Sequence, residues 1–153
     1  MRELKDKIIA ITGGATGIGF ALAKSFGKDG AKIVIGEPRE AERQKAVEEL
    51  KNLDIEANET HLDVTDLESV KNFANFTCKS FGRVDILINN AGISGARGRM
   101  DTVDIDQAKK VFDVNFFGVW QGCAVFSKKM IEQGTESAIY NVGSENSLFI
   151  AVP

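Results

Sequence analysis

A glycine-rich turn between a predicted strand and a predicted helix constrains the fold of this chain more than any other feature. The turn reads T-G-G-A-T-G-I-G over 12–19, with an apolar run before it and apolar residues at helical spacing after it. Backbone N–H groups at the N-terminus of a helix bind an anion, and glycine allows the backbone to come close to it. The segment therefore predicts a phosphate-binding turn at the first strand–helix junction of an α/β fold.

Strand and helix patterns alternate along the rest of the sequence. Short apolar runs, several of them rich in β-branched residues, predict strands at 7–12, 31–35, 55–62, 84–88 and 137–142. Helical periodicity predicts helices at 17–27, 39–52, 65–81 and 104–133, with Thr65 as the N-cap of the third and Gly134 as the stop of the fourth. Alternation with short connections predicts a doubly wound parallel sheet in the order 3-2-1-4-5, within one domain over 1–153.

The composition excludes several classes of function. The chain has 153 residues and a net charge of -3, so it offers no basic surface for nucleic acid and no polybasic membrane patch. The charged segment 1–7 precedes only a short apolar run, so we expect neither a signal peptide nor a spanning helix. Two distant cysteines, Cys78 and Cys123, and the single histidine His61 argue against a disulfide and a zinc site. We therefore expect a cytoplasmic protein that binds neither nucleic acid nor membranes.

Five motifs occur in an order that resembles the short-chain dehydrogenase/reductase family. They are the glycine turn at 12–19, Asp63 after the third strand, N-N-A-G at 89–92 after the fourth, Asn115 within the fourth helix and N-V-G-S at 141–144 after the fifth. The resemblance covers essentially the whole chain. It implies a Rossmann-type fold and NAD(P)-dependent hydride transfer between a nicotinamide and a small alcohol or carbonyl substrate.

The choice between NAD and NADP depends on the end of the second strand. Glu37 is expected to accept hydrogen bonds from ribose hydroxyls and to repel a 2′-phosphate. Thr16 is not basic, which also favours NAD, whereas Arg39 could turn toward a 2′-phosphate and keeps NADP as the alternative. The expected cofactor-binding residues are Thr12, Gly13, Gly17, Ile18, Gly19, Glu37, Asp63, Val64, Asn89, Ala91 and Gly92.

Two of these assignments have structural alternatives. The resemblance implies that Asp63 contacts the adenine amino group and that Val64 supports the ring, but an acid before a helix can also act as its cap. The N-N-A-G motif is expected to line the cofactor cleft and also to form a rigid turn, because asparagine side chains bond to nearby backbone.

The candidate catalytic residues are Asn115 and Ser144. Asn115 falls on the apolar stripe of the fourth helix, so we expect a buried amide with hydrogen-bond partners; the resemblance implies that it holds a water in a proton relay. Ser144 matches the family's serine that bonds to the substrate oxygen, with Ser147 as a second choice. Tyr140 has no lysine four positions later, so we expect it to pack on the sheet instead of acting in catalysis.

The family's Tyr-x-x-x-Lys segment would lie beyond Pro153, so we expect a fold that is incomplete on its C-terminal side and a chain that is inactive alone. The fifth strand would be left as an open edge, and Phe116, Phe117, Trp120 and Val125 would be left uncovered. We expect self-association or a partner here, and a homo-oligomer for the complete protein. A non-catalytic nucleotide-binding module and an interaction subunit remain alternatives.

Overall fold

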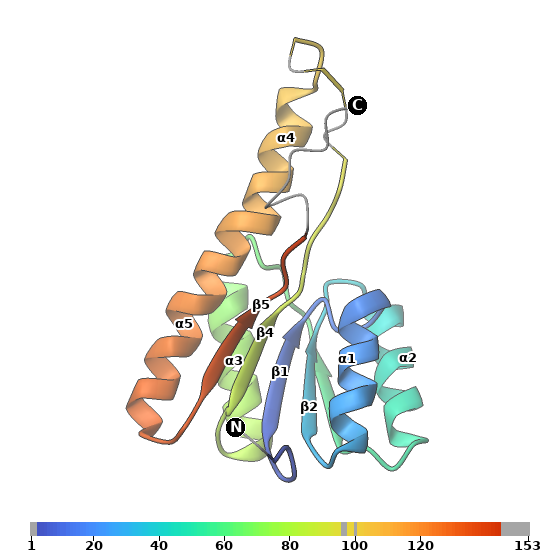
Figure 1. Ribbon diagram of the computed structural model, residues 1–153, viewed down its shortest axis with the longest axis vertical. Coiled ribbons are helices and arrows are strands. Elements are labelled where there is room, and N and C mark those ends of the chain that lie inside the picture. Colours follow the sequence, from blue (N-terminus) through green and yellow to red (C-terminus); the bar gives the residue numbers. More distant parts are fainter. Residues whose placement is uncertain (1–2, 96–97, 100, 145–153) are drawn as a thin grey trace.

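A parallel sheet with the strand order β3-β2-β1-β4-β5 forms the centre of the molecule (Figure 1). The computed structural model describes residues 3–95, 98–99 and 101–144. Its strands are β1 (Ile8–Thr12), β2 (Lys32–Gly36), β3 (Ala57–Thr60), β4 (Ile86–Asn89) and β5 (Ala138–Asn141), and its helices are α1 (Gly17–Lys28), α2 (Glu40–Lys51), α3 (Leu67–Phe81), α4 (Ile105–Phe112), η1 (Asp113–Phe117) and α5 (Gly118–Gln133). The predicted fold class and strand order are confirmed.

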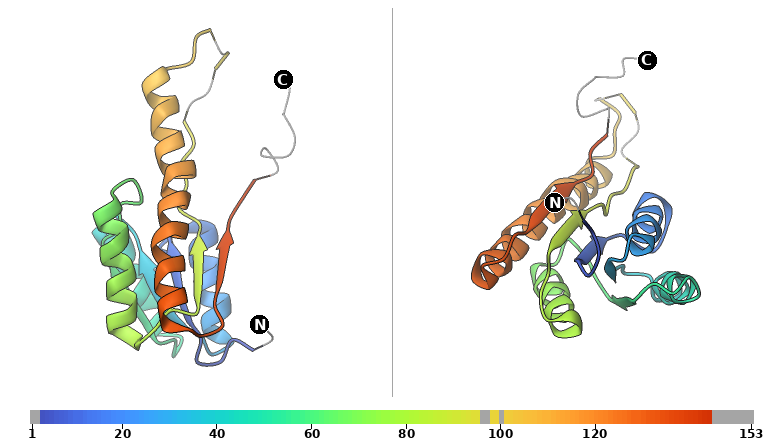
Figure 2. Two further views of the ribbon diagram at one scale, coloured as in Figure 1. Left: turned by 90° about the vertical axis from the view of Figure 1, so that its left-hand side faces the viewer. Right: turned by 60° about the horizontal axis from the view of Figure 1, so that its bottom comes forward.

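Helices cover both faces of this sheet (Figure 2). Along β1, Ile9 and Ile11 belong to the core beneath α1 and α2, whereas Ala10 belongs to the core beneath α3 and α5. Successive residues of a strand point to opposite faces, so a strand covered on both sides must be apolar throughout. This explains why the central strands are continuous apolar runs in the sequence.

Two predictions about the helices are wrong in detail. The segment predicted as one regular helix over 104–133 contains a π-helical turn, η1, between α4 and α5. The N-cap of α3 is Asp66, whose carboxylate accepts a hydrogen bond from Glu68 N at 2.9 Å, and not Thr65. Thr65 is bonded to Asp63 instead, since its hydroxyl and its N–H both donate to Asp63 Oδ1, at 2.7 and 2.9 Å.

The side of the molecule formed by α5 and β5 carries much exposed apolar surface. Phe116, Phe117 and Trp120 are exposed as predicted, but Val125 packs against the core beneath α5. Tyr140 lies within β5, yet 55% of it is exposed, so the prediction that it packs on the sheet is wrong in that respect. Among the described residues no helix has the length and apolarity needed to cross a membrane.

A buried carboxylate joins β1 and β4 at the amino ends of the strands. Asp85 is 1% exposed, and its Oδ2 accepts a hydrogen bond from Ile8 N at 2.8 Å. Arg83 Nε lies 2.9 Å from Asp85 Oδ1 and 3.0 Å from Oδ2. A buried charge needs such partners, so Asp85 fixes the relation of the two central strands at the edge opposite the glycine turn.

We expect Asp85→Asn to lower the free energy of unfolding by about 2 kcal/mol, since it weakens one backbone hydrogen bond and removes a paired charge. Asp101→Asn is the matched control, because Asp101 pairs with Arg99 on the exposed surface and such pairs contribute about 0–1 kcal/mol. Urea unfolding measures both. Equal stabilities of the two variants would contradict a role for Asp85 in joining the strands.

Candidate functional site

The glycine turn places the N-terminus of α1 at the carboxyl end of β1. Gly13 N donates to Gly36 O at 2.7 Å, which anchors the turn to β2. Gly17, the first residue of α1, has φ of 55°, a conformation that favours glycine. A Cβ at Gly19 would overlap the carbonyl oxygen of Gly13 and the side-chain amide of Asn90. The turn therefore brings bare backbone to a helix N-terminus, as an anion site requires.

A hydrogen-bonded clamp joins this turn to the end of β4. The Thr12 hydroxyl accepts hydrogen bonds from Asn90 N at 3.0 Å and Ala91 N at 2.9 Å. In return, Asn90 Nδ2 donates to Thr12 O and Gly13 O, both at 3.0 Å. The clamp lies between strands β1 and β4, where the strand order reverses, and ligands of doubly wound sheets bind at this point.

A cavity of about 360 Å³ opens beside the clamp at the carboxyl edge of the sheet. Six of the predicted cofactor-binding residues line it, together with five others: Gly13, Glu37, Pro38, Arg39, Leu62, Asp63, Val64, Ala91, Gly92, Ile93 and Val114. Thr12 and Asn89 lie buried beneath this edge, and Gly17, Ile18 and Gly19 open α1 next to it. Ile18 is 65% exposed and does not line the cavity.

Glu37 is buried at the end of β2 and paired with Arg39. Its side chain is only 4% exposed, and its Oε1 accepts hydrogen bonds from Arg39 Nε at 2.7 Å and Arg39 N at 3.2 Å. The hydrogen bond and the charge of Glu37 raise the pKa of the Arg39 guanidinium above its ordinary value. Arg39 also donates to the Thr16 hydroxyl at 3.3 Å, so it spans from β2 to the glycine turn.

Asp63 is held by its own loop and does not cap α3. Its carboxylate Oδ1 takes both donors of Thr65, and its N–H donates to Ser69 Oγ at 2.9 Å. The alternative interpretation of Asp63 as a helix cap is therefore wrong, because Asp66 has that role. Val64 lies beside it and lines the same cavity.

Asn115 lies in the π-helical turn η1 and is exposed, so the predicted burial is wrong. Its side chain nevertheless has partners: Oδ1 accepts from Ile93 N and Nδ2 donates to Ile93 O, both at 2.9 Å. An extra residue in a helical turn changes the direction of the side chains that follow, and such turns are frequent at functional sites. The prediction from the apolar stripe failed because this part of the segment packs on no core among the described residues: Ile105 and Phe112 of the same stripe are also exposed.

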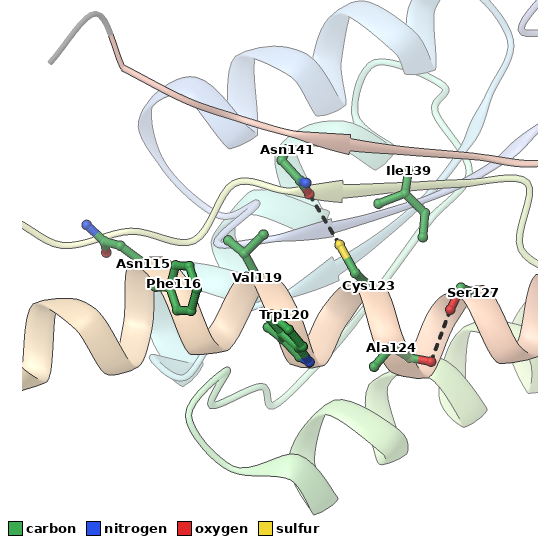
Figure 3. Close-up of a pocket in the computed structure, with 9 residues that line it drawn as sticks. All are labelled: Asn115, Phe116, Val119, Trp120, Cys123, Ala124, Ser127, Ile139 and Asn141. Atoms are coloured by element: carbon green, nitrogen blue, oxygen red, sulfur yellow. Dashed lines mark hydrogen bonds between the residues drawn. The ribbon is translucent and has the colours of Figure 1, made fainter. Parts of the chain in front are cut away.

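A second cavity, of about 500 Å³, lies between α5 and β5 (Figure 3). Asn115 and Asn141 line it, and the Cys123 thiol donates to Asn141 Oδ1 at 3.6 Å. Asn89 Nδ2, buried behind them, also donates to Asn141 Oδ1, at 2.8 Å. Ser144 is exposed beyond β5, on the same edge of the sheet as the glycine turn, and is not among the lining residues. Ser147 lies outside the described residues.

Sequence reasoning missed several residues of this edge. Asn90 was included in its motif but not assigned a role, although it makes most of the clamp. Val114 lines the first cavity, and its place next to Asn115 was the available signal. Nothing in the sequence pointed to Ile93 as the partner of Asn115. The described residues contain no group of three side chains able to hold a metal ion.

Comparisons with known proteins identify the family. The profile described as short chain dehydrogenase matches residues 7–152, and the chain belongs to the short-chain dehydrogenase/reductase family. The chain is 34% identical to "Short chain aldehyde dehydrogenase 1" of Euphorbia lathyris over 153 residues, which is 99% of this chain and 52% of that protein. The chain spans about half the length, or less, of the curated relatives it matches.

Solved structures show the same fold. A short-chain dehydrogenase/reductase from Burkholderia phymatum in complex with NAD has a TM-score of 0.94 and 31% identity, covering 100% of this chain and 54% of that one. An NAD+-bound xylitol dehydrogenase has a TM-score of 0.92 and 26% identity, covering 99% of this chain and 57% of that one.

We expect Thr12→Val to lower the free energy of unfolding by about 2–3 kcal/mol, since valine keeps the shape but leaves the N–H groups of Asn90 and Ala91 without their acceptor. Thr12→Ser keeps the hydroxyl and serves as the control. Chemical denaturation measures the effect. If the valine and serine variants were equally stable, the clamp would not hold the two strand ends together.

Proposed function

We propose that this chain is one cofactor-binding domain that holds NAD at the carboxyl edge of its sheet. The observation that carries the proposal is the cavity in which the glycine turn, Glu37 and the Asp63–Val64 loop meet. The glycine turn fits a pyrophosphate, because Gly13 lines the cavity and Gly17 begins α1 in a conformation that favours glycine, so backbone N–H groups at a helix N-terminus face the site. Thr12, Asn89, Ala91 and Gly92 would shape the edge that the cofactor contacts.

The preference for NAD over NADP is supported by Glu37. A carboxylate at the end of β2 can accept hydrogen bonds from the ribose hydroxyls, whereas it repels a 2′-phosphate. Two similar structures are described as NAD complexes. Arg39 partly offsets this preference, because its guanidinium neutralises Glu37 and could attract a phosphate.

We further propose that the whole protein oxidises alcohols or reduces carbonyl compounds. The nicotinamide, when bound, would accept or donate the hydride. Ser144 would donate a hydrogen bond to the substrate oxygen. Both side-chain groups of Asn115 are already bonded to Ile93, so Asn115 would act in a proton relay by fixing the backbone around it. A homo-oligomer and a cytoplasmic location belong to the same proposal.

Glu37→Gln should reduce the preference for NAD about tenfold, because it removes the charge that repels the 2′-phosphate and weakens the hydroxyl acceptor. Calorimetric titration with NAD and NADP gives the ratio of the two affinities. Glu40→Gln, on the exposed first turn of α2, makes the same chemical change and should leave the ratio unaltered. Tighter binding of NADP than of NAD by the unmodified chain would disprove the NAD preference.

Ser144→Ala should lower kcat by about 10²–10³-fold and leave the KM for NAD unchanged, because the hydroxyl contacts the substrate and not the cofactor. The measurement follows NADH absorbance with a panel of alcohols and ketones, in the chain joined to the further sequence that its longer relatives carry. Ser127→Ala is the control, since Ser127 lines the α5–β5 cavity and bonds only to its own helix at Ala124 O. An unchanged kcat in the Ser144→Ala variant would show that Ser144 has no role in the reaction.

A further inference from the structure

Gln121 of α5 forms hydrogen bonds to the loop that carries Asp63, and it does not line the cavity. Its Nε2 donates to Val64 O and to Thr65 O, both at 3.3 Å. The helix comes close at this point because Gly118, one turn earlier, has no side chain; a Cβ there would lie 2.8 Å from Val64 Cγ2. Neither the sequence motifs nor the family resemblance gave Gln121 a role.

A single peptide unit, Val64–Thr65, links Gln121 to the Asp63 carboxylate. The carbonyl of Val64 and the N–H of Thr65 belong to the same planar group and point in opposite directions. Gln121 holds the carbonyl side, and the N–H side donates to Asp63 Oδ1 at 2.9 Å. Fixing the plane of this peptide therefore fixes the direction in which Asp63 presents its carboxylate. Hydrogen bonds in such a chain also polarise one another.

The amide of Gln121 combines two donor contacts to the loop with one acceptor that has no partner among the described residues. Its own oxygen, Oε1, is buried and has no hydrogen-bond partner among the described residues. A buried acceptor without a donor is unfavourable, and an apolar side chain of the same size would avoid the cost. What glutamine supplies here, and an apolar residue would not, is the donor for Val64 O and Thr65 O.

We propose that Gln121 is a positioning residue for adenine recognition: by holding the Val64–Thr65 peptide, it aims the Asp63 carboxylate at the amino group of the base. This inference rests on the proposed binding of adenine at Asp63. Gln121 itself touches no cofactor; it acts through the loop. It selects for a base with an exocyclic amino group, which is a finer property than dinucleotide binding.

The test compares AMP with inosine monophosphate, whose base carries an oxygen in place of the adenine amino group. Calorimetric titration of the unmodified chain should show tighter binding of AMP. Gln121→Met should lower the affinity for AMP about tenfold while that for inosine monophosphate changes little. Methionine removes the unpaired oxygen but also the donor of Val64 O and Thr65 O, so thermal melting should show only a small change in stability, and the ratio of the two affinities is the readout that a purely structural role would not move.

Gln133→Met is the matched control on the same helix. Gln133 also bonds to backbone, but at the amino end of the sheet. Its Nε2 donates to Val84 O at 2.7 Å, and its Oε1 accepts from Val84 N at 3.2 Å. This variant should melt at a lower temperature and keep the preference for AMP. The two variants are thus expected to differ in the preference for AMP, which Gln121→Met should lose and Gln133→Met should keep.

Three outcomes would overturn the proposal. If the Gln121→Met variant keeps the preference for AMP, Gln121 has no role in adenine recognition, and the assignment of Asp63 is unaffected. Equal binding of AMP and inosine monophosphate by the unmodified chain would overturn both. Gln121→Glu is the second variant, because an ionised carboxylate cannot donate a hydrogen bond. If Gln121→Glu and Gln121→Met both fail to fold while Gln133→Met folds, the role of Gln121 is structural.

Discussion

The pair of hydrogen bonds accepted by the Thr12 hydroxyl is the interaction on which the site depends. Neighbouring strands whose connections run to opposite faces of a sheet leave a crevice at their carboxyl ends, and the backbone there lacks ladder partners. Thr12 provides the acceptor for two such N–H groups, those of Asn90 and Ala91. In return, the side chain of Asn90 donates to the backbone carbonyl of Thr12. Gly19 then packs against the same Asn90 amide, so the shape of the glycine turn is set by the end of β4 as well as by its own residues.

The fold could be predicted from the sequence because its signals are local and repeat. Each central strand is apolar on both faces, and each helix has an apolar stripe, so strand type and parallel order follow from a few residues at a time. Edge strands were less well defined: β3 is Ala57–Thr60 within a predicted range of 55–62, because a strand with one neighbour is only partly apolar. Six of the eleven predicted cofactor-binding residues meet in one cavity, because the motif positions fall at strand ends, where the topology brings them together.

The features that sequence reasoning missed depend on contacts between distant segments. Thr65 and Asp66 are both residue types that cap helices, and the structure shows Thr65 bonded to Asp63 while Asp66 accepts from Glu68 N. The π-helical turn η1 was not predicted, and neither was the exposure of Asn115, because the apolar stripe of this segment has no described core to pack against: Ile105 and Phe112 are exposed as well. Gln121 reaches its loop only because Gly118 lets two segments approach, and such an approach is a property of packing, not of propensity.

The ion pair at the end of β2 reconciles two opposing requirements of the site. A ribose acceptor must be buried enough to be specific, yet a buried carboxylate without a partner is strongly unfavourable. Glu37 meets the first requirement with a side chain that is 4% exposed, and Arg39 meets the second. The Arg39 side chain is itself 58% exposed and has a flexible stem, so in the proposed complex it would leave Glu37 for water at a small cost when ribose hydroxyls take its place. An exposed partner for a buried acid therefore stabilises Glu37 without closing the proposed subsite, and the same guanidinium would limit how strongly that subsite rejects a phosphate.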